Sequence, residues 1–288
     1  MGSRNAKRVK NLHGMEQIAI DLKPHRCDSF VYSQVDLDMT NLVKYIEKKK
    51  KQGENITLFH AFVTAIGKVF YNREKLNNFV QNRHVFKHND IVIGFVAKVA
   101  FEDHAEEMMI MVPIKENDNL ESISKFIKDK VDGIRNKKFK KEGANDAIDI
   151  LGKLPNIIRV PLVGALKWCD DKGILPASLC KDNLYYSSTI VSNLGSIGSN
   201  SIHHNLTNFG TSSSLITMGE IVDKEIIKGD KKEVRKICDW GVAFDERVAD
   251  GFYLIKSLKM LQYIIDNPEM LEEDASKKVE VPKKETKK

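Results

Sequence analysis

Apolar residues recur at intervals of three and four in four long segments, which predicts four amphipathic helices. We expect these helices at residues 40–51, 57–70, 120–134 and 251–265. The second pattern is the most regular, and its apolar stripe consists of Phe59, Phe62, Val63, Ile66, Val69 and Phe70. This helix is therefore expected to be buried in the core.

Strand patterns lie between and after these helices. Residues 31–37 alternate apolar and polar side chains, and residues 91–100 form a nearly continuous apolar run, which is typical of a central strand. Further strands are expected at 108–112, 185–193, 215–222 and 234–244, with short helices near 147–154 and 163–171. Helices early in the chain and strands late favour an α+β fold over repeated βαβ units.

The ends of the chain differ from its middle in composition. We expect a flexible leader at residues 1–14, one folded domain at 15–272, and a disordered lysine-rich tail at 273–288. No apolar run approaches the roughly 18 residues that a membrane span requires, so no membrane partner is expected. The N-terminus also lacks the apolar core of a signal peptide, and the expected location is the cytoplasm.

The net charge of +6 does not indicate a nucleic-acid partner, because of where the charges lie. The first ten residues carry +4 and residues 276–288 carry another +4, which leaves the rest of the chain at −2. A nucleic-acid-binding protein is expected to carry a basic face on its folded body instead. We therefore expect no nucleic-acid partner.

The four cysteines do not indicate a metal site. Cys27, Cys169, Cys180 and Cys238 include no pair with the two-residue spacing of a zinc knuckle or a redox motif. We expect reduced thiols and no metal. The chain also lacks the glycine-rich loops that bind nucleotide phosphates.

Two segments carry the motifs that indicate a family. The first runs from Ser192 to Gly198 (Ser-Asn-Leu-Gly-Ser-Ile-Gly), and the second runs from Phe244 to Gly251 (Phe-Asp-Glu-Arg-Val-Ala-Asp-Gly). Together, and in this order, they resemble the catalytic domain of the dihydrolipoamide acyltransferases of 2-oxo acid dehydrogenase complexes. More distantly they resemble chloramphenicol acetyltransferase. The resemblance covers roughly residues 20–270, and it is to members of the superfamily that stand alone, without a lipoyl domain.

The resemblance implies a chloramphenicol acetyltransferase-like two-layer α+β fold, a mixed β-sheet covered by helices. It also implies a homotrimer in which coenzyme A or acyl-coenzyme A and an acceptor enter opposite ends of a channel between subunits. In the family, a histidine takes the proton from the attacking thiol or hydroxyl. A serine or threonine of the neighbouring subunit then donates a hydrogen bond to the oxyanion.

The resemblance assigns a role to each motif residue. Ser192 matches the oxyanion donor, and Asp250 matches a structural aspartate for which Arg26 is the candidate partner. The family motif reads Asp-His-Arg-x-x-Asp-Gly, and the position of its catalytic histidine is occupied by Glu246. This departure from the family pattern bears directly on catalysis.

Three interpretations of Glu246 follow. A thiol (pKa about 8.5) gives its proton to histidine (about 6.5) more readily than to glutamate (about 4.3), by roughly 3 kcal/mol. Glu246 is therefore either ion-paired with a cation such as Arg247, with the chemistry lost or altered, or a working base whose pKa is raised by burial. In the third interpretation the base is displaced to His203 or His204, about ten residues after Ser192.

Two classes of function are consistent with these residues. One is a coenzyme A-dependent acyltransferase-like enzyme with altered or weakened base chemistry, which passes an acyl group to a thiol or hydroxyl. The alternative is a pseudoenzyme, a non-catalytic homologue that binds coenzyme A or has a structural or regulatory role. Such a homologue would assemble with a related acyltransferase or a complex subunit.

Overall fold

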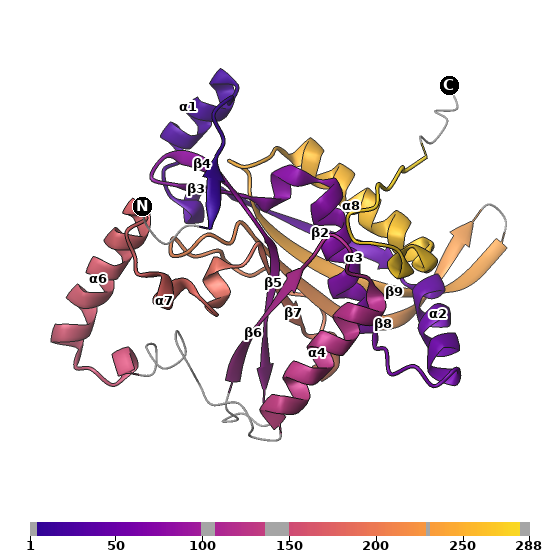
Figure 1. Ribbon diagram of the computed structural model, residues 1–288. Coiled ribbons are helices and arrows are strands. Elements are labelled where there is room, and N and C mark those ends of the chain that lie inside the picture. Colours follow the sequence, from indigo (N-terminus) through magenta and orange to yellow (C-terminus); the bar gives the residue numbers. More distant parts are fainter. Residues whose placement is uncertain (1–4, 99–106, 136–149, 229–230, 283–288) are drawn as a thin grey trace.

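A six-stranded mixed β-sheet forms the centre of the molecule (Figure 1). The structure is a computed structural model, and it describes residues 5–98, 107–135, 150–228 and 231–282. Across the sheet the strand order is β2 (Phe30–Asp38), β9 (Lys231–Asp245), β8 (Ser214–Lys228), β7 (Thr189–Asn193), β5 (Ile91–Lys98) and β6 (Glu107–Ile114). Strand β7 is parallel to both of its neighbours, whereas the remaining pairs are antiparallel.

Four helices form the second layer and cover one side of this sheet (Figure 1). They are α2 (Thr40–Lys51), α3 (Leu58–Asn72), α4 (Leu120–Arg135) and α8 (Gly251–Asp266). Helix α3 begins after Thr57, whose hydroxyl accepts a hydrogen bond from the backbone N–H of His60. Its apolar stripe is buried in the main core, as the sequence predicts. A mixed sheet covered by helices confirms the predicted two-layer α+β fold.

The remaining elements lie to one side of these two layers or connect them. A small sheet has the strand order β1 (Ala6–Arg8), β4 (His84–His88) and β3 (Asn78–Gln81). The other helices are α1 (Gly14–Leu22), α6 (Asn156–Lys172) and α7 (Ala177–Cys180). Short 3₁₀ segments occupy Arg26–Asp28, Glu74–Asn77, Leu184–Tyr186, Gly195–Ile197 and Pro268–Glu272.

The ends of the chain are more ordered than the sequence predicts. Part of the expected flexible leader forms β1, which pairs with β4 from Ala6 opposite His88 to Arg8 opposite Phe86. Part of the expected disordered tail is also anchored, because Ala275 and Val279 are buried in the core. Composition predicted disorder at both ends, but strand pairing and apolar burial fix these segments.

One of the two short helices expected from the sequence differs from the structure. The helix expected at 163–171 is the second half of the longer α6, which continues through Pro161. The helix expected near 147–154 lies partly outside the described residues.

Among the described helices, none combines the length and apolarity that a bilayer span requires.

Candidate active site

Ser192 lies near the end of β7, beside a cavity of about 240 Å³. It is opposite Thr217 of the parallel strand β8 and is partly buried. Within the described residues, its hydroxyl has no hydrogen-bond partner. Ser192 is therefore available to donate to a group that enters the cavity.

The Asn-Leu-Gly sequence that follows Ser192 fits the close packing of this loop against β8. After β7 the chain turns back over β8, and Leu194 donates its backbone N–H to the carbonyl of Met218 at 2.9 Å. A Cβ atom at Gly195 would collide with the carbonyl oxygen of Gly219. Only glycine permits this close approach, which fixes the loop beside Ser192.

The two histidines proposed as displaced bases occupy different places. His204 lines the same cavity as Ser192, and its Nδ1 lies 3.3 Å from the carbonyl oxygen of Asn205. The ring of His203 instead stacks on Tyr32, with ring centroids 4.8 Å apart. Of the two, the structure brings only His204 together with Ser192.

Glu246 lies in the turn after β9, where its backbone N–H donates to the carbonyl of Ser29 at 3.0 Å. Its carboxylate is ion-paired with the ammonium group of Lys23. Glu246 is therefore ion-paired with a cation, as the sequence predicts, but the cation is Lys23 and not Arg247. Glu246 does not line the cavity of Ser192, so one chain does not combine these two positions in a single site.

Arg247 is held by its neighbour Asp245. The guanidinium donates from Nε at 2.9 Å and from a terminal nitrogen at 2.7 Å to the Asp245 carboxylate, which is fully buried. Ser29 also donates to this carboxylate, at 3.1 Å. The first aspartate of the motif is thus a buried anchor that fixes the turn.

The predicted pairing of Arg26 with Asp250 is wrong. Arg26 is buried, its Nε lies 3.8 Å from the Asp245 carboxylate, and its terminal nitrogens donate to backbone carbonyls. The accepting carbonyls belong to Thr207, Phe209 and Gly210, at 2.7–3.3 Å. Burial lowers the pKa of Arg26, and the facing Asp245 carboxylate opposes this effect.

Asp250 has a different function. It is exposed, and its carboxylate accepts a hydrogen bond of 2.7 Å from the backbone N–H of Tyr253. This is the geometry of an N-cap, and Asp250 begins helix α8. The second aspartate of the motif therefore stabilises the first turn of the helix.

Sequence reasoning missed Asp170 at the end of α6. Its buried carboxylate accepts hydrogen bonds from the Tyr186 hydroxyl at 2.6 Å and from the backbone N–H of Gly210 at 2.8 Å. The side-chain amide of Gln81 donates to the same carboxylate at 3.1 Å. In the sequence Asp170 stands in an unremarkable Asp-Asp-Lys run, so only the tertiary structure identifies it.

No metal site is present in the part of the chain that the structure describes. There, no three or more His, Cys, Asp or Glu side chains are grouped to hold a metal ion.

The fold is similar to that of chloramphenicol acetyltransferase and of dihydrolipoamide acetyltransferase cores. Chloramphenicol acetyltransferase matches 91% of this chain and 98% of its own, with a TM-score of 0.52 and 9% identity. A probable dihydrolipoamide acetyltransferase from Listeria monocytogenes matches 91% of this chain and 95% of its own, with a TM-score of 0.59 and 17% identity. The predicted fold is thus confirmed.

Part of the chain also shows a likeness in sequence to a family. Residues 177–272 match the model of the 2-oxoacid dehydrogenases acyltransferase catalytic domain, and this segment contains both motifs. The cubic core of the pyruvate dehydrogenase multienzyme complex matches 91% of this chain and 93% of its own, with a TM-score of 0.61 and 13% identity. No curated protein sequence matches the chain. The resemblance predicted from the two motifs is confirmed.

Proposed function

We propose that this protein is an acyltransferase-like subunit that binds coenzyme A or an acyl-coenzyme A but has lost the family's efficient acyl transfer. One observation carries the proposal: Glu246 stands at the histidine position, and its carboxylate is ion-paired with Lys23. Accepting a proton from an acceptor thiol would remove the charge that Lys23 compensates. The carboxylate is thus engaged with Lys23 and does not line the cavity of Ser192.

The cavity of Ser192 supports a retained binding role. Its hydroxyl has no partner among the described residues, and the walls of the cavity combine apolar side chains with polar groups. A thioester carbonyl could accept a hydrogen bond from this hydroxyl, as an oxyanion does in the family's reaction. Binding of the donor thus needs only Ser192, whereas transfer also needs a base.

We further propose that the chain assembles as a trimer, alone or mixed with a related acyltransferase. Support comes from the match to the core of a multienzyme complex, and from the separation of Ser192 and Glu246 within one chain. A channel between subunits would bring these two positions together. Light scattering at several concentrations tests this; a monomer throughout would contradict it.

Titration calorimetry with coenzyme A and acetyl-coenzyme A at moderate salt tests the binding role. We expect saturable binding that Ser192→Ala weakens about tenfold, the effect of one lost hydrogen bond. The control is Ser196→Ala, because Ser196 is an exposed serine of the same loop. Absence of binding up to millimolar ligand would refute the binding role and leave assembly alone.

A second experiment tests the lost chemistry. Acetyl transfer from acetyl-coenzyme A to dihydrolipoamide would be followed in the natural protein and in Glu246→His. We expect little or no transfer by the natural protein and a gain in the variant, because histidine restores a base matched to the thiol. Efficient transfer by the natural protein that depends on Glu246 would overturn the proposal.

His204 supports a second candidate function, acyl transfer with a displaced base, because it shares the cavity with Ser192. In that case the natural protein transfers acetyl groups, and His204→Gln abolishes the transfer. His203→Gln is the matched control, since His203 stacks on Tyr32 instead. Transfer that survives His204→Gln would exclude this candidate.

A further inference from the structure

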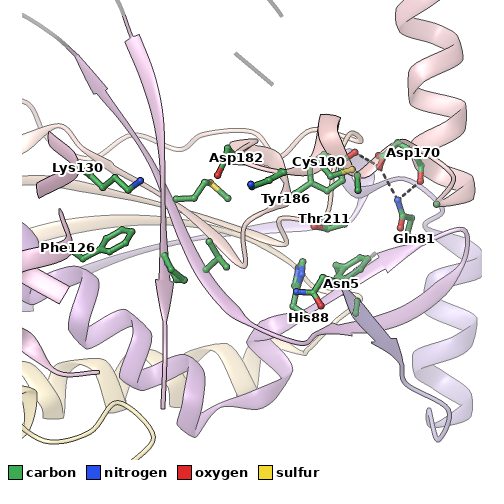
Figure 2. Close-up of a pocket in the computed structure, with 18 residues that line it drawn as sticks. Asn5, Gln81, His88, Phe126, Lys130, Asp170, Cys180, Asp182, Tyr186 and Thr211 are labelled. Atoms are coloured by element: carbon green, nitrogen blue, oxygen red, sulfur yellow. Dashed lines mark hydrogen bonds between the residues drawn. The ribbon is translucent and has the colours of Figure 1, made fainter. Parts of the chain in front are cut away.

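A second cavity, of about 510 Å³, lies apart from the cavity of Ser192 (Figure 2). Its walls come from the small sheet, from the β5 and β6 edge of the large sheet, from α4, and from the segment around α6 and α7. The two cavities share no lining residue. The volume is within the range of pockets that hold small organic molecules.

One end of this cavity is built on the Asp170 carboxylate. Asp170 accepts hydrogen bonds from Tyr186, Gly210 and Gln81, which belong to three different parts of the chain. Figure 2 shows Gln81 and Asp170 at one end of the cavity, with Lys130 and Phe126 at the other. The buried carboxylate thus holds several walls in fixed positions.

The wall near Asp170 contains polar atoms without partners. Nine buried side-chain nitrogen or oxygen atoms in the described residues have no hydrogen-bond partner, and three of them belong to side chains of this cavity. These three are Oε1 of Gln81, Oγ1 of Thr211 and Nε2 of His88. Gln81 and Thr211 are 5% and 4% exposed.

Buried polar atoms are nearly always paired, so a group of orphaned atoms in one cavity wall indicates a missing partner. We expect an uncharged partner, because the orphaned groups are neutral and the charged group beside them, the Asp170 carboxylate, already accepts hydrogen bonds from three donors. Gln81 and Thr211 are neutral, and burial lowers the pKa of His88 to about 4, so its imidazole is neutral at pH 7. Together these groups can accept and donate hydrogen bonds.

The rest of the wall combines apolar side chains with the charged residues Lys130, Lys181 and Asp182. Strands β5 and β6 contribute Val92, Met111 and Pro113, and helix α4 contributes Phe126. An aliphatic chain packed on these side chains would be removed from water. The cavity therefore combines an apolar surface with the neutral orphaned groups of Gln81, Thr211 and His88.

We propose that this cavity is a second ligand site, which binds a small uncharged amphiphile with an amide head and a short aliphatic chain. The amide N–H would donate to Gln81, and its carbonyl would accept from Thr211 or His88. The chain would lie along Met111 and Phe126. The proposal does not rest on acyl transfer or on binding of coenzyme A.

Hexanamide is the probe, and the methyl group of Met111 in methionine-labelled protein is the reporter. In methyl NMR we expect a saturable shift of the Met111 resonance, which Met111→Leu identifies. Hexanoate should bind at least tenfold more weakly, because its carboxylate would lie beside the neutral orphaned groups and near the anionic Asp170. An unchanged Met111 resonance at the solubility limit of hexanamide would overturn the proposal.

Two variants test the orphaned atoms. Thr211→Val and His88→Phe keep the shape of each side chain, and we expect each to weaken hexanamide binding about tenfold. Both should also raise the melting temperature, because each removes a buried polar atom without a partner. Unchanged hexanamide binding in both variants would overturn the proposal.

Ser213→Ala provides the matched control, since Ser213 carries another orphaned hydroxyl that lies outside this cavity. It should raise the melting temperature without changing hexanamide binding. Titration with coenzyme A should be unchanged in Thr211→Val, which separates this site from the cavity of Ser192. If Ser213→Ala weakened hexanamide binding as much as Thr211→Val does, the assignment of the ligand site to this cavity would be contradicted.

Discussion

The turn that carries Glu246 and the cavity wall that carries His88 are both rich in polar groups, but they differ in how those groups are paired. In the turn, the Asp245 carboxylate receives hydrogen bonds from Ser29 and Arg247, and Glu246 is paired with Lys23. In the wall, His88 and Thr211 each carry a buried polar atom without a partner. The first arrangement is complete in itself, whereas the second is completed by a ligand.

This difference separates a structural region from a proposed binding region within one chain. A paired charge network stabilises the fold and leaves little capacity for further chemistry. Orphaned atoms lower stability, and their presence in a cavity indicates binding. The Glu246 turn is therefore the more structural of the two regions.

The largest expected effect comes from removing the central charge of the turn. Asp245→Asn should lower the free energy of unfolding by about 3–5 kcal/mol, because it leaves buried guanidinium groups without compensation. Urea denaturation measures this change. Asp36→Asn is the control, since the exposed Asp36–Lys224 pair of 2.8 Å is solvent-screened and should contribute little. Similar losses of unfolding free energy in both variants would contradict the difference between the buried Asp245 network and an exposed ion pair.

The His88 wall should respond to pH. Burial lowers the pKa of His88 to about 4 in the folded protein, whereas the unfolded value is about 6.5. The unfolded chain therefore binds a proton first as the pH falls, and stability is lost between pH 6.5 and 4, by about 3 kcal/mol. His88→Phe should lack this part of the loss when unfolding is compared at pH 7 and 4.5. If the unfolding free energy of the natural protein and of His88→Phe changed in parallel with pH, the low pKa of His88 would be contradicted.

A smaller effect is expected at the helix that follows the turn. Asp250→Ala removes the N-cap of α8 and should cost about 1 kcal/mol in thermal or urea unfolding. Asp250→Asn should retain most of the stability, because asparagine caps equally well. If Asp250→Asn were as costly as Asp250→Ala, the charge rather than the cap would be essential.

The smallest effect is expected at the rim of the turn. Lys23→Met breaks the ion pair with Glu246, but Lys23 is half exposed, so unfolding should change by less than about 1 kcal/mol. The small difference should shrink further in high salt, which screens exposed charges. A loss of several kcal/mol would show that the pair is a buried anchor like Asp245.

Much of the fold follows from local patterns in the sequence. The stripe of α3 and its cap at Thr57 depend on residues within a few turns, and both were predicted. The order of the two motifs likewise predicted the family resemblance. By contrast, β1 was missed because a three-residue strand has too short a pattern to recognise.

The candidate site was less predictable, because its contacts join distant segments. Lys23 and Glu246 are 223 residues apart in the sequence, and Gln81 and Asp170 are 89 apart. Arg26 was expected beside Asp250, but the carbonyls of the 207–210 loop and Asp245 bind it instead. No periodicity reveals such partners, which only the tertiary fold brings together.

The pairing of β2 with β9 has a consequence for how the protein is made. Phe30 is opposite Asp245, and Asp38 is opposite Ile237, so the two strands are separated by roughly 200 residues of chain. A ribosome adds about 5–20 residues per second, so β2 waits on the order of 10–40 s for its neighbour. During that time its edge is open to other chains, and chaperones that shield nascent strands should bind this segment.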